Sequence, residues 1–275
     1  MTDDWLRATA RPVRLAKIDP TVPNVARVWN YLVGGRDNFA ADRNAARQLI
    51  EVAPVMGAVG PGSRAFLRRA VGYLAADVGV RQFLDIGTGI PTAGNTHHVA
   101  QATAPESRVV YVDYDPIVLA HARALLTSSE AGATEYIDAD LRDTDTILSR
   151  ASRLLDFTQP VAVTMLFILH AIPDEDDPHA IVATVLDALP SGSYLALSHL
   201  GSDIFDEEAQ QGFQNIVGRM SQQQYTGRSR EQMLRFFKGM ELVEPGLVRI
   251  EEWRPDPDSA GDYKSTAWGA VGRKR

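Results

Sequence analysis

The chain has 275 residues, of which 45% are hydrophobic and 23% are charged, and it contains no cysteine. These values are typical of one globular unit with a full core, and they exclude collagen-like and disordered chains, disulfides, thiolate zinc sites and cysteine nucleophiles. The 28 lysines and arginines against 35 acidic residues give a net charge of −7, which argues against a nucleic-acid partner because cationic side chains supply much of the affinity for phosphates.

The sequence predicts a cytoplasmic protein with no membrane partner. Its first residues are acidic where a signal peptide needs positive charge. The longest apolar stretch, Val161 to Ile172, is too short to cross a bilayer and is predicted to be a buried strand. The absence of cysteine suits a reducing compartment. Nothing in the sequence indicates the oligomeric state.

Residues 1–79 are predicted to form an N-terminal arm and a helical cap. The first 23 residues contain three prolines and no sustained period, as in an irregular arm. Helical periodicity follows, broken by glycines, and Pro61 is taken as the first residue of the last cap helix because proline is favoured there. The predicted helices run from Asn24 to Gly34, from about Asn38 to Val52, and from Pro61 to Gly79.

Residues 80–275 are predicted to form an α/β core. Short apolar runs alternate there with helical patterns, which is typical of βαβ units and a parallel sheet. The predicted strands are Gln82–Ile86, Arg108–Asp113, Thr134–Asp138, Val161–Phe167, Ser193–His199, Met240–Val243 with Leu247–Ile250, and Ser265–Val271.

The clearest motif follows the first predicted strand, where a glycine turn opens a helix. Glycines allow a ligand to approach the backbone closely, and the helix start offers unpaired N–H groups. Asp85 in the strand can hold the turn or accept from a ligand ammonium group, while a tight turn without a ligand is the alternative. Thr92 replaces the third glycine of the dinucleotide fingerprint, which argues against NAD. The candidate contacts in the turn are Gly87, Thr88, Gly89 and Pro91.

Asp113 ends the second predicted strand, twenty-odd residues beyond the glycines. A carboxylate at this position of a doubly wound sheet can accept both hydroxyls of a ribose. Asp115 and Pro116 have the pattern of a helix N-cap and first helical residue, so Asp115 is either structural or a further contact. Tyr114 either lies against a purine ring or packs in the core.

Asp140 and Leu141 follow the third predicted strand. An acidic side chain here can accept from an adenine amino group while a neighbouring backbone N–H meets a ring nitrogen. The alternative is a loop of solvated aspartates. Together, three such groups at successive strand ends indicate one site, because open α/β sheets bind ligands at the carboxyl ends of their strands.

The order of Asp85, the glycines, Asp113 and Asp140 resembles the class I Rossmann-like methyltransferases that depend on S-adenosylmethionine. Several phrases are also similar to one bacterial family, named S-adenosyl methyltransferase and formerly a domain of unknown function. The resemblance covers nearly the whole chain. It implies bound S-adenosylmethionine and a seven-stranded, mostly parallel sheet with its last strand antiparallel and helices on both faces. The phrases are residues 31–39, 64–70, 82–89, 111–116 and 253–255.

Methyl transfer from a sulfonium is an in-line displacement, so the protein mainly orients the reactants and excludes water. A base is needed only when the acceptor must lose a proton. The resemblance implies that the end of the fourth strand, with Phe167, faces the methyl group. His170 is the candidate base, and the alternative is a histidine that satisfies a local hydrogen bond. No metal site is predicted.

The segment Tyr31 to Arg43 is predicted to form a lid over the methionine end of the cofactor. Arg36 can pair with its carboxylate, and Tyr31 or Asn38 can donate to it beside Gly34. The alternative is a capped turn in which Arg36 pairs with Asp37 or Asp42.

The predicted function is methyl transfer to a small, partly hydrophobic acceptor. One alternative is a module that binds the cofactor without catalysis. Another is an NAD-dependent oxidoreductase, against which the missing third glycine and the missing Tyr-x-x-x-Lys pair argue. Residues that can line an acceptor pocket, although helical spacing predicts most of them in the core, are Phe205, Phe213, Met220, Tyr225, Met233, Phe236 and Phe237.

Overall fold

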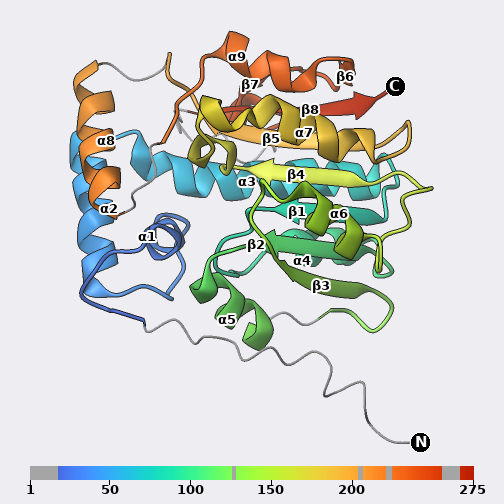
Figure 1. The fold of residues 1–275 in the computed structure, drawn as a ribbon, viewed down its shortest axis with the longest axis horizontal. Helices are drawn as coiled ribbons and strands as arrows, with labels where there is room; N and C mark the ends of the chain where they lie inside the picture. The colour runs from blue at the N-terminus through green and yellow to red at the C-terminus, as the bar shows by residue number, and fades with distance from the viewer. Residues whose placement is uncertain (1–17, 126–127, 204–206, 221–224, 256–266) are drawn as a thin grey trace, which may run out of the picture.

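The computed structural model describes residues 18–125, 128–203, 207–220, 225–255 and 267–275. These residues build one mixed sheet with helices on both faces (Figure 1), which confirms the predicted α/β class. The predicted arm lies mostly outside the described residues. In the described part of the chain, no helix is both long enough and apolar enough to span a membrane.

The sheet follows the order β3-β2-β1-β4-β5-β8-β6, and a short strand β7 pairs with β8. Strands β1 to β5 are parallel, and β8 runs antiparallel to β5, as predicted for a last strand. The strands are β1 Gln82–Ile86, β2 Arg108–Asp113, β3 Ala133–Asp138, β4 Ala162–Leu166, β5 Tyr194–Leu200, β6 Met240–Leu242, β7 Val248–Arg249 and β8 Ala267–Lys274.

The order in which strands are added to the sheet reverses at β1, which pairs with β2 on one side and with β4 on the other. The chain reaches β2 and β3 in one direction from β1, and β4 and β5 in the other. Such a switch point opens a crevice at the carboxyl ends of the strands. The glycine turn after β1 and the loop after β4 therefore face each other across this crevice.

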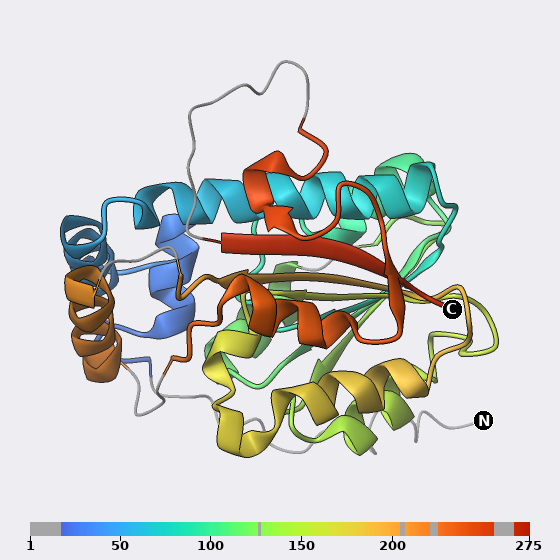
Figure 2. The same cartoon turned by 90° about the horizontal axis from the view of Figure 1, so that it is seen from above.

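The helices divide between the two faces of the sheet. Figure 2 shows α3 across one face and α6 with α7 against the other. Along β1, Phe83 belongs to the hydrophobic cluster under α3, whereas Leu84 and Ile86 belong to the opposite cluster, as the alternation of strand side chains requires. The helices are α1 Val25–Leu32, α2 Ala40–Val52, α3 Met56–Ala76, α4 Thr96–Thr103, α5 Pro116–Leu125, α6 Thr144–Ala151, α7 Pro178–Asp187, α8 Glu207–Met220 and α9 Arg230–Leu234.

The predicted start of the third helix at Pro61 is wrong, because α3 begins at Met56 and Pro61 lies inside it. Proline in a helix interior removes one backbone hydrogen bond. Here Met56 and Val59 are buried in the core. Their packing stabilises the turn that precedes the proline and outweighs the missing bond.

Strand ends differ from the prediction by a few residues. Strand β4 ends at Leu166 because Phe167 takes a left-handed backbone conformation, with φ of 54°. Strand β8 continues past Val271 to Lys274, and its last residues pair with β6. The predicted residues Ser265 and Thr266 lie outside the described part.

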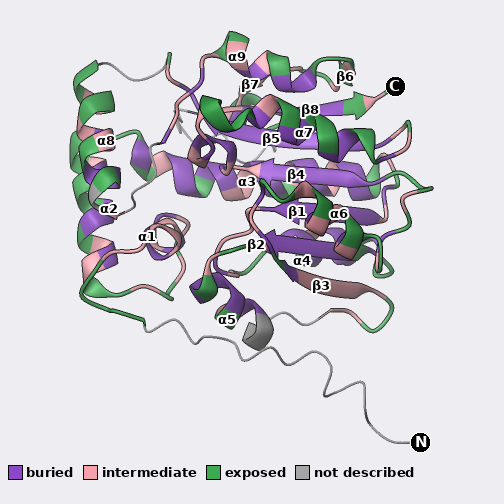
Figure 3. Ribbon diagram, viewed as in Figure 1, coloured by how far each residue is buried: buried purple, intermediate pink, exposed green. Residues whose placement is uncertain are grey.

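In space the cap consists of α1, α2, the start of α3, and α8 from much later in the chain (Figure 1). Most of α3, by contrast, covers the sheet, where Phe66 packs edge-on against Trp253 at 5.5 Å between ring centroids. The outer sides of α2 and α8 are exposed, and their inner sides join the buried cluster under α3 (Figure 3). The cap and the sheet thus share one hydrophobic core.

Gly60 provides a test of how closely α1 packs against α3. A Cβ at this position would overlap the backbone carbonyl of Leu32 at the end of α1. Replacing Gly60 by alanine is expected to lower the free energy of unfolding by about 1–3 kcal/mol, the range for overpacking. The measurement is urea unfolding followed by circular dichroism.

Gly57→Ala is the matched control in the same helix. Its Cβ would lie 3.9 Å from Ile50, an ordinary contact, and alanine raises helix propensity by up to about 1 kcal/mol. Equal unfolding midpoints for the two variants would contradict close packing of α1 on α3.

Candidate functional site

Two adjoining hollows lie at the carboxyl ends of β1, β2 and β4. The smaller is a slot between the loops after β2, β3 and β4, and the larger is a cleft roofed by the cap. The residues that line both hollows are Gly87, Asp113, Tyr114, Ile168 and Ala171. Because these walls are shared, a ligand can extend from the slot into the cleft.

The glycine turn requires its glycines. Gly87 has φ of 78° and donates its N–H to Val112 O at 2.8 Å, and a Cβ there would lie 2.5 Å from the side chain of Ile168. Gly89 has φ of 64° and donates its N–H to Asp113 Oδ2 at 2.9 Å. The structure therefore brings the predicted glycine turn into contact with Asp113, the residue predicted to bind a ribose.

Asp113 lies where the slot meets the cleft. Its Oδ1 accepts from the backbone N–H of Asp115 at 3.0 Å, and its Oδ2 accepts from Gly89. Burial raises the pKa of this carboxyl to about 6, against the two N–H groups, which lower it. A carboxylate has lone pairs left for hydroxyl donors even with both of these bonds made.

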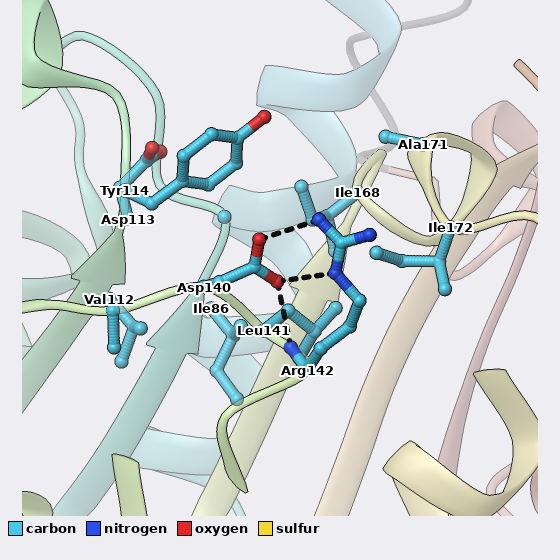
Figure 4. A pocket seen from close by; sticks show the side chains of 12 residues that line it. Ile86, Val112, Asp113, Tyr114, Asp140, Leu141, Arg142, Ile168, Ala171 and Ile172 are labelled. Atoms are coloured by element: carbon cyan, nitrogen blue, oxygen red, sulfur yellow. Dashed lines mark hydrogen bonds and ion pairs between the residues drawn. The ribbon is translucent and has the colours of Figure 1, made fainter. Parts of the chain in front are cut away.

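Asp140 lines the slot, and its carboxylate is already held by Arg142 (Figure 4). Arg142 donates from Nε to Oδ1 at 2.9 Å and from Nη2 to Oδ2 at 2.7 Å, and Arg142 Nη1 lies 2.9 Å from Asp176 Oδ2. The bonds from Arg142 lower the pKa of Asp140. Asp140 is thus neither a free adenine ligand nor a merely solvated aspartate, but an oriented, ionised acceptor.

The rest of the slot is apolar. Tyr114, which is 47% exposed, stands at its rim in Figure 4. Leu141, one of the predicted contacts, is buried at 5% exposure beside it. The remaining aliphatic walls are Ile86, Val112, Ala139, Ile168, Ala171 and Ile172. A flat, mostly apolar ring with polar edges matches these walls.

Asp85 lies beneath the glycine turn and lines neither hollow. Thr96 at the start of α4 donates to its Oδ2 at 2.5 Å, and only 7% of the residue is exposed. Burial raises the pKa of Asp85. This geometry favours the predicted role in holding the turn over contact with a ligand ammonium group.

Asp115 immediately precedes α5 and caps its first turn, as the predicted capping pattern requires. Its Oδ1 accepts from the N–H of Ile117 at 2.8 Å, and its Oδ2 accepts from Asn24 Nδ2 in the cap at 3.2 Å. Asp115 also lines the cleft. It therefore joins the cap to the rim of the sheet beside the site.

His170 and Phe167 lie in the loop after β4 and line the cleft. His170 is 8% exposed, and its ring stacks on Tyr225 with centroids 4.7 Å apart. Its Nδ1 is buried with no hydrogen-bond partner among the described residues. Burial, together with nearby His199 and Arg228, holds the pKa of His170 well below its usual value, so the ring is neutral at physiological pH.

Phe167 packs against a residue of the cap. Its ring centroid lies 5.2 Å from that of Trp29 on α1. Its φ of 54° is unusual for a residue with a side chain and implies strain at the floor of the cleft. The cap and the loop after β4 therefore meet through two aromatic rings.

A buried arginine holds the loop that carries His170. Arg228 is 1% exposed and donates to the carbonyls of Leu169 and Ile172 at 2.8 and 2.9 Å. Its Nη2 lies 2.7 Å from Asp174, and its Nη1 lies 2.8 Å from Nε2 of His199. Burial lowers the pKa of His199 to about 3, so this imidazole can accept from the guanidinium.

The predicted lid is only partly assembled at the site. Gly34, Arg36 and Pro91 line a separate groove beside the glycine turn, together with Arg64 and Asn95. Tyr31 and Asn38 do not line the groove, the slot or the cleft. In the described residues no ion pair of Arg36 is found, so the predicted pairing with Asp37 or Asp42 is absent.

Two residues named in that segment have other structural roles. Asn38 Nδ2 donates to Asn30 Oδ1 at 2.9 Å and to Gly35 O at 3.0 Å, which closes the turn after α1. Asp42 pairs with Arg27, with Nε and Oδ2 2.8 Å apart in a buried contact. Both interactions fix the entry to α2.

Thr88, from the glycine turn, contacts Tyr136 through hydroxyls 3.4 Å apart.

The residues proposed for an acceptor pocket separate into two groups. Phe213, Met220 and Tyr225 line the cleft. Met233, Phe236 and Phe237 lie instead in the core cluster on the opposite face of the sheet, as helical spacing suggested. Phe205 lies outside the described residues.

Sequence reasoning missed Asn24, Trp29, Arg142 and Ile168 as site residues. Asn24 and Trp29 looked like parts of an ordinary amphipathic helix, and only the position of the cap brings them to the cleft. Arg142 had a local signal, since it follows Asp140 by two residues. Among the described residues, no group of three histidines and acids lies close enough to hold a metal ion.

Comparison with known proteins gives a consistent result. Residues 12–275 match the model of a family described as S-adenosyl methyltransferase. A DUF574 family protein from Streptomyces avermitilis is 41% identical, with a TM-score of 0.87 over 94% of this chain and 99% of that one. A candidate methyltransferase from Thermobifida fusca is 38% identical, with a TM-score of 0.82 over 93% and 96%.

More distant structures share the fold alone. A SAM-dependent methyltransferase from Anabaena variabilis is 15% identical, with a TM-score of 0.52 over 95% of this chain and 99% of that one. A search of curated proteins gave no match.

Arg228 is expected to be essential for the stability of the loop after β4. Arg228→Met would leave two carbonyls, Asp174 and His199 without their buried donor, and we expect a loss of about 3–5 kcal/mol in the free energy of unfolding. Denaturant unfolding measures it. Arg235→Met is the control, since that exposed side chain has only a 3.7 Å contact with Glu231, and an equal loss there would refute the role of Arg228.

Proposed function

Because the chain belongs to the S-adenosyl methyltransferase family, we propose that it methylates a small-molecule acceptor bound in the cleft beneath the cap. The family makes the protein an S-adenosylmethionine-dependent methyltransferase. Two features support a small acceptor. The cleft is roofed by α1 and α8, and the net charge of −7 does not favour a polyanion.

The observation that carries the proposal is the continuity of the slot, Asp113 and the glycine turn. We place the adenine against the apolar walls of the slot with its amino group toward Asp140, where the ribose hydroxyls can donate to Asp113. Gly87 allows Ile168 to pack directly on the turn, and both Gly87 and Gly89 line the cleft, so the turn presents its backbone there. These residues fit S-adenosylmethionine, and we assign them to its adenosine part.

For the methionine end we propose the groove lined by Pro91, Gly34 and Arg36. Thr88 and Gly89 precede Pro91 in the turn and are proposed to contact the same part of the cofactor. An exposed guanidinium at this groove suits a carboxylate. The geometry gives no such role to Tyr31 and Asn38. Asp115 acts in this proposal through the cap, which it joins to the rim of the site.

When bound, S-adenosylmethionine supplies a methyl group on a positively charged sulfur. The chain itself orients the acceptor and keeps the region dry, and the aromatic contact of Trp29 with Phe167 closes the cleft on the cap side. His170 is neutral and therefore able to take a proton from an acceptor that must lose one.

We propose that the cap and the α/β core have different roles in binding. Residues 80–275 bind the adenosine part of the cofactor, and Gly34 and Arg36 of the cap reach its methionine end. The rest of the cap covers the acceptor, with α8 completing the cover from the C-terminal half. A cytoplasmic location remains our expectation from the sequence.

Gly87→Ala tests cofactor binding. A methyl group here would meet Ile168 and would also strain a backbone with φ of 78°, so we expect the affinity for S-adenosylmethionine to fall at least tenfold. Isothermal titration calorimetry with S-adenosylmethionine and with NADH is the measurement. Wild-type protein that binds NADH and not S-adenosylmethionine would overturn the proposed function.

Gly94→Ala is the control for backbone strain. Its φ is 75°, but its Cβ would lie 3.7 Å from Arg64 Nη2, which is an ordinary contact. We expect it to lose stability without a comparable loss of cofactor affinity.

Asp113 makes a second prediction, about pH. The ionised carboxylate accepts from the ribose with both oxygens, whereas protonation converts one oxygen into a donor. The affinity for S-adenosylhomocysteine is therefore expected to fall, by up to about tenfold per pH unit, below about pH 6. Asp113→Asn should bind more weakly, by about 1.5–3 kcal/mol, with no such dependence. Calorimetry between about pH 5 and pH 8 gives both results.

Asp138→Asn is the matched control, because Asp138 lies opposite Asp113 in the register of β2 and β3 and lines neither hollow. Its pH profile should follow that of the wild type. An identical profile for Asp113→Asn would exclude Asp113 from the cofactor site.

A further inference from the structure

We propose that the methyl acceptor is an uncharged aromatic molecule with a hydroxyl group, and that the hydroxyl proton passes to His170. This inference rests on the proposed function and specifies the chemistry of the acceptor in the same cleft. Three independent features of the cleft support it: its aromatic walls, its distribution of charge, and the unpartnered histidine.

The part of the cleft away from the glycine turn is apolar and rich in aromatic rings. Trp29 and Phe167 form one wall, and Phe213 packs edge-on against Tyr225 at 6.4 Å in another. Flat rings favour a flat ligand, since offset and edge contacts add to the gain from burial. The aliphatic residues around them are Val28, Leu32, Leu49, Met56, Leu166, Leu200 and Val217, with Met220.

Among the described residues that line the cleft, charge is confined to one end. The charged side chains there are Asp113 and Asp115, both beside the glycine turn. An ammonium group in the apolar part would be desolvated without a counter-ion, and so would a carboxylate. An uncharged acceptor avoids both penalties.

His170 is a polar group at the acceptor end, stacked on Tyr225. It is more than nine-tenths buried, it lines the cleft, and its Nδ1 has no partner in the described part of the chain. A buried polar atom left unpaired calls for a ligand or another explanation. The titratable and charged groups near it are His199 on β5, Arg228 after α8, and the stacked Tyr225.

A hydroxyl group is the acceptor that a neutral histidine serves best. A phenol enters uncharged and must lose its proton to become a strong nucleophile. In the step, the phenol oxygen forms a bond to the methyl carbon, its O–H bond breaks, and the proton goes to a ring nitrogen of His170. The sulfur keeps the electron pair of the broken S–C bond and becomes a neutral thioether.

The test compares three probes that share one ring system and differ in charge: 2-naphthol, 2-naphthoate and 2-naphthylmethylammonium. Their binding to wild-type protein saturated with S-adenosylhomocysteine is measured by calorimetry. We expect 2-naphthol to bind at least tenfold more tightly than either ion. Tighter binding of an ion, or binding of none of the three, would overturn the inference while cofactor binding leaves the proposed function standing.

The same titration distinguishes a failure of the proposed function from a failure of the inference about the acceptor. If S-adenosylhomocysteine itself does not bind, the proposed function fails and the inference fails with it. Met220→Glu provides a charge control, because it places a carboxylate at the acceptor end. This variant should gain affinity for the ammonium probe and lose it for 2-naphthol, and an unchanged preference would place the probes elsewhere.

The role of His170 is tested by methylation of 2-naphthol, followed by mass spectrometry of the methyl ether. His170→Gln should lower the turnover rate by about 10²–10⁴-fold, the range for a general base, while the affinity for 2-naphthol changes less than about threefold. An unchanged rate, or a wild type that binds 2-naphthol but never methylates it, would overturn the proton transfer.

Discussion

The site is organised around the carboxylate of Asp113, which joins the turn after β1 to the segment between β2 and α5. One oxygen receives the N–H of Gly89 from the turn after β1, and the other receives the N–H of Asp115 before α5. Burial raises its pKa above the ordinary value of 3.8, so the contribution of this group to folding falls as the pH rises from about 4 through about 6. The free site therefore holds a disfavoured charge, which hydroxyl donors from a ligand would stabilise.

The cap is joined to the sheet close to Asp113. Asn24 reaches Asp115 from the start of α1, and the buried pair of Arg27 with Asp42 fixes α1 to α2. Because α8 packs on α2, the roof of the cleft is built from both ends of the chain. The acceptor side of the site is thus formed by long-range packing, whereas the cofactor side is formed by consecutive strand ends.

This difference explains how much the sequence could predict. Strands β1 and β2 agree with the prediction to the residue, because short apolar runs ended by Gly87 and Asp113 carry a local signal. The helix start predicted at Pro61 is wrong because the burial of Met56 and Val59 outweighs the local preference of proline for the first position of a helix. The binding of the Asp140 carboxylate by Arg142 depends on the direction of two side chains in the loop after β3. The spacing of residues in the sequence does not determine that direction.

Phe167 carries two requirements that oppose each other. Its left-handed backbone suits glycine or asparagine, yet only a large ring can meet Trp29 across the cleft. Glycine or asparagine would relax the main chain but would open a gap between the cap and the sheet. Variation at this position is therefore expected to be coupled to variation at Trp29, so that the two rings change together over the course of evolution.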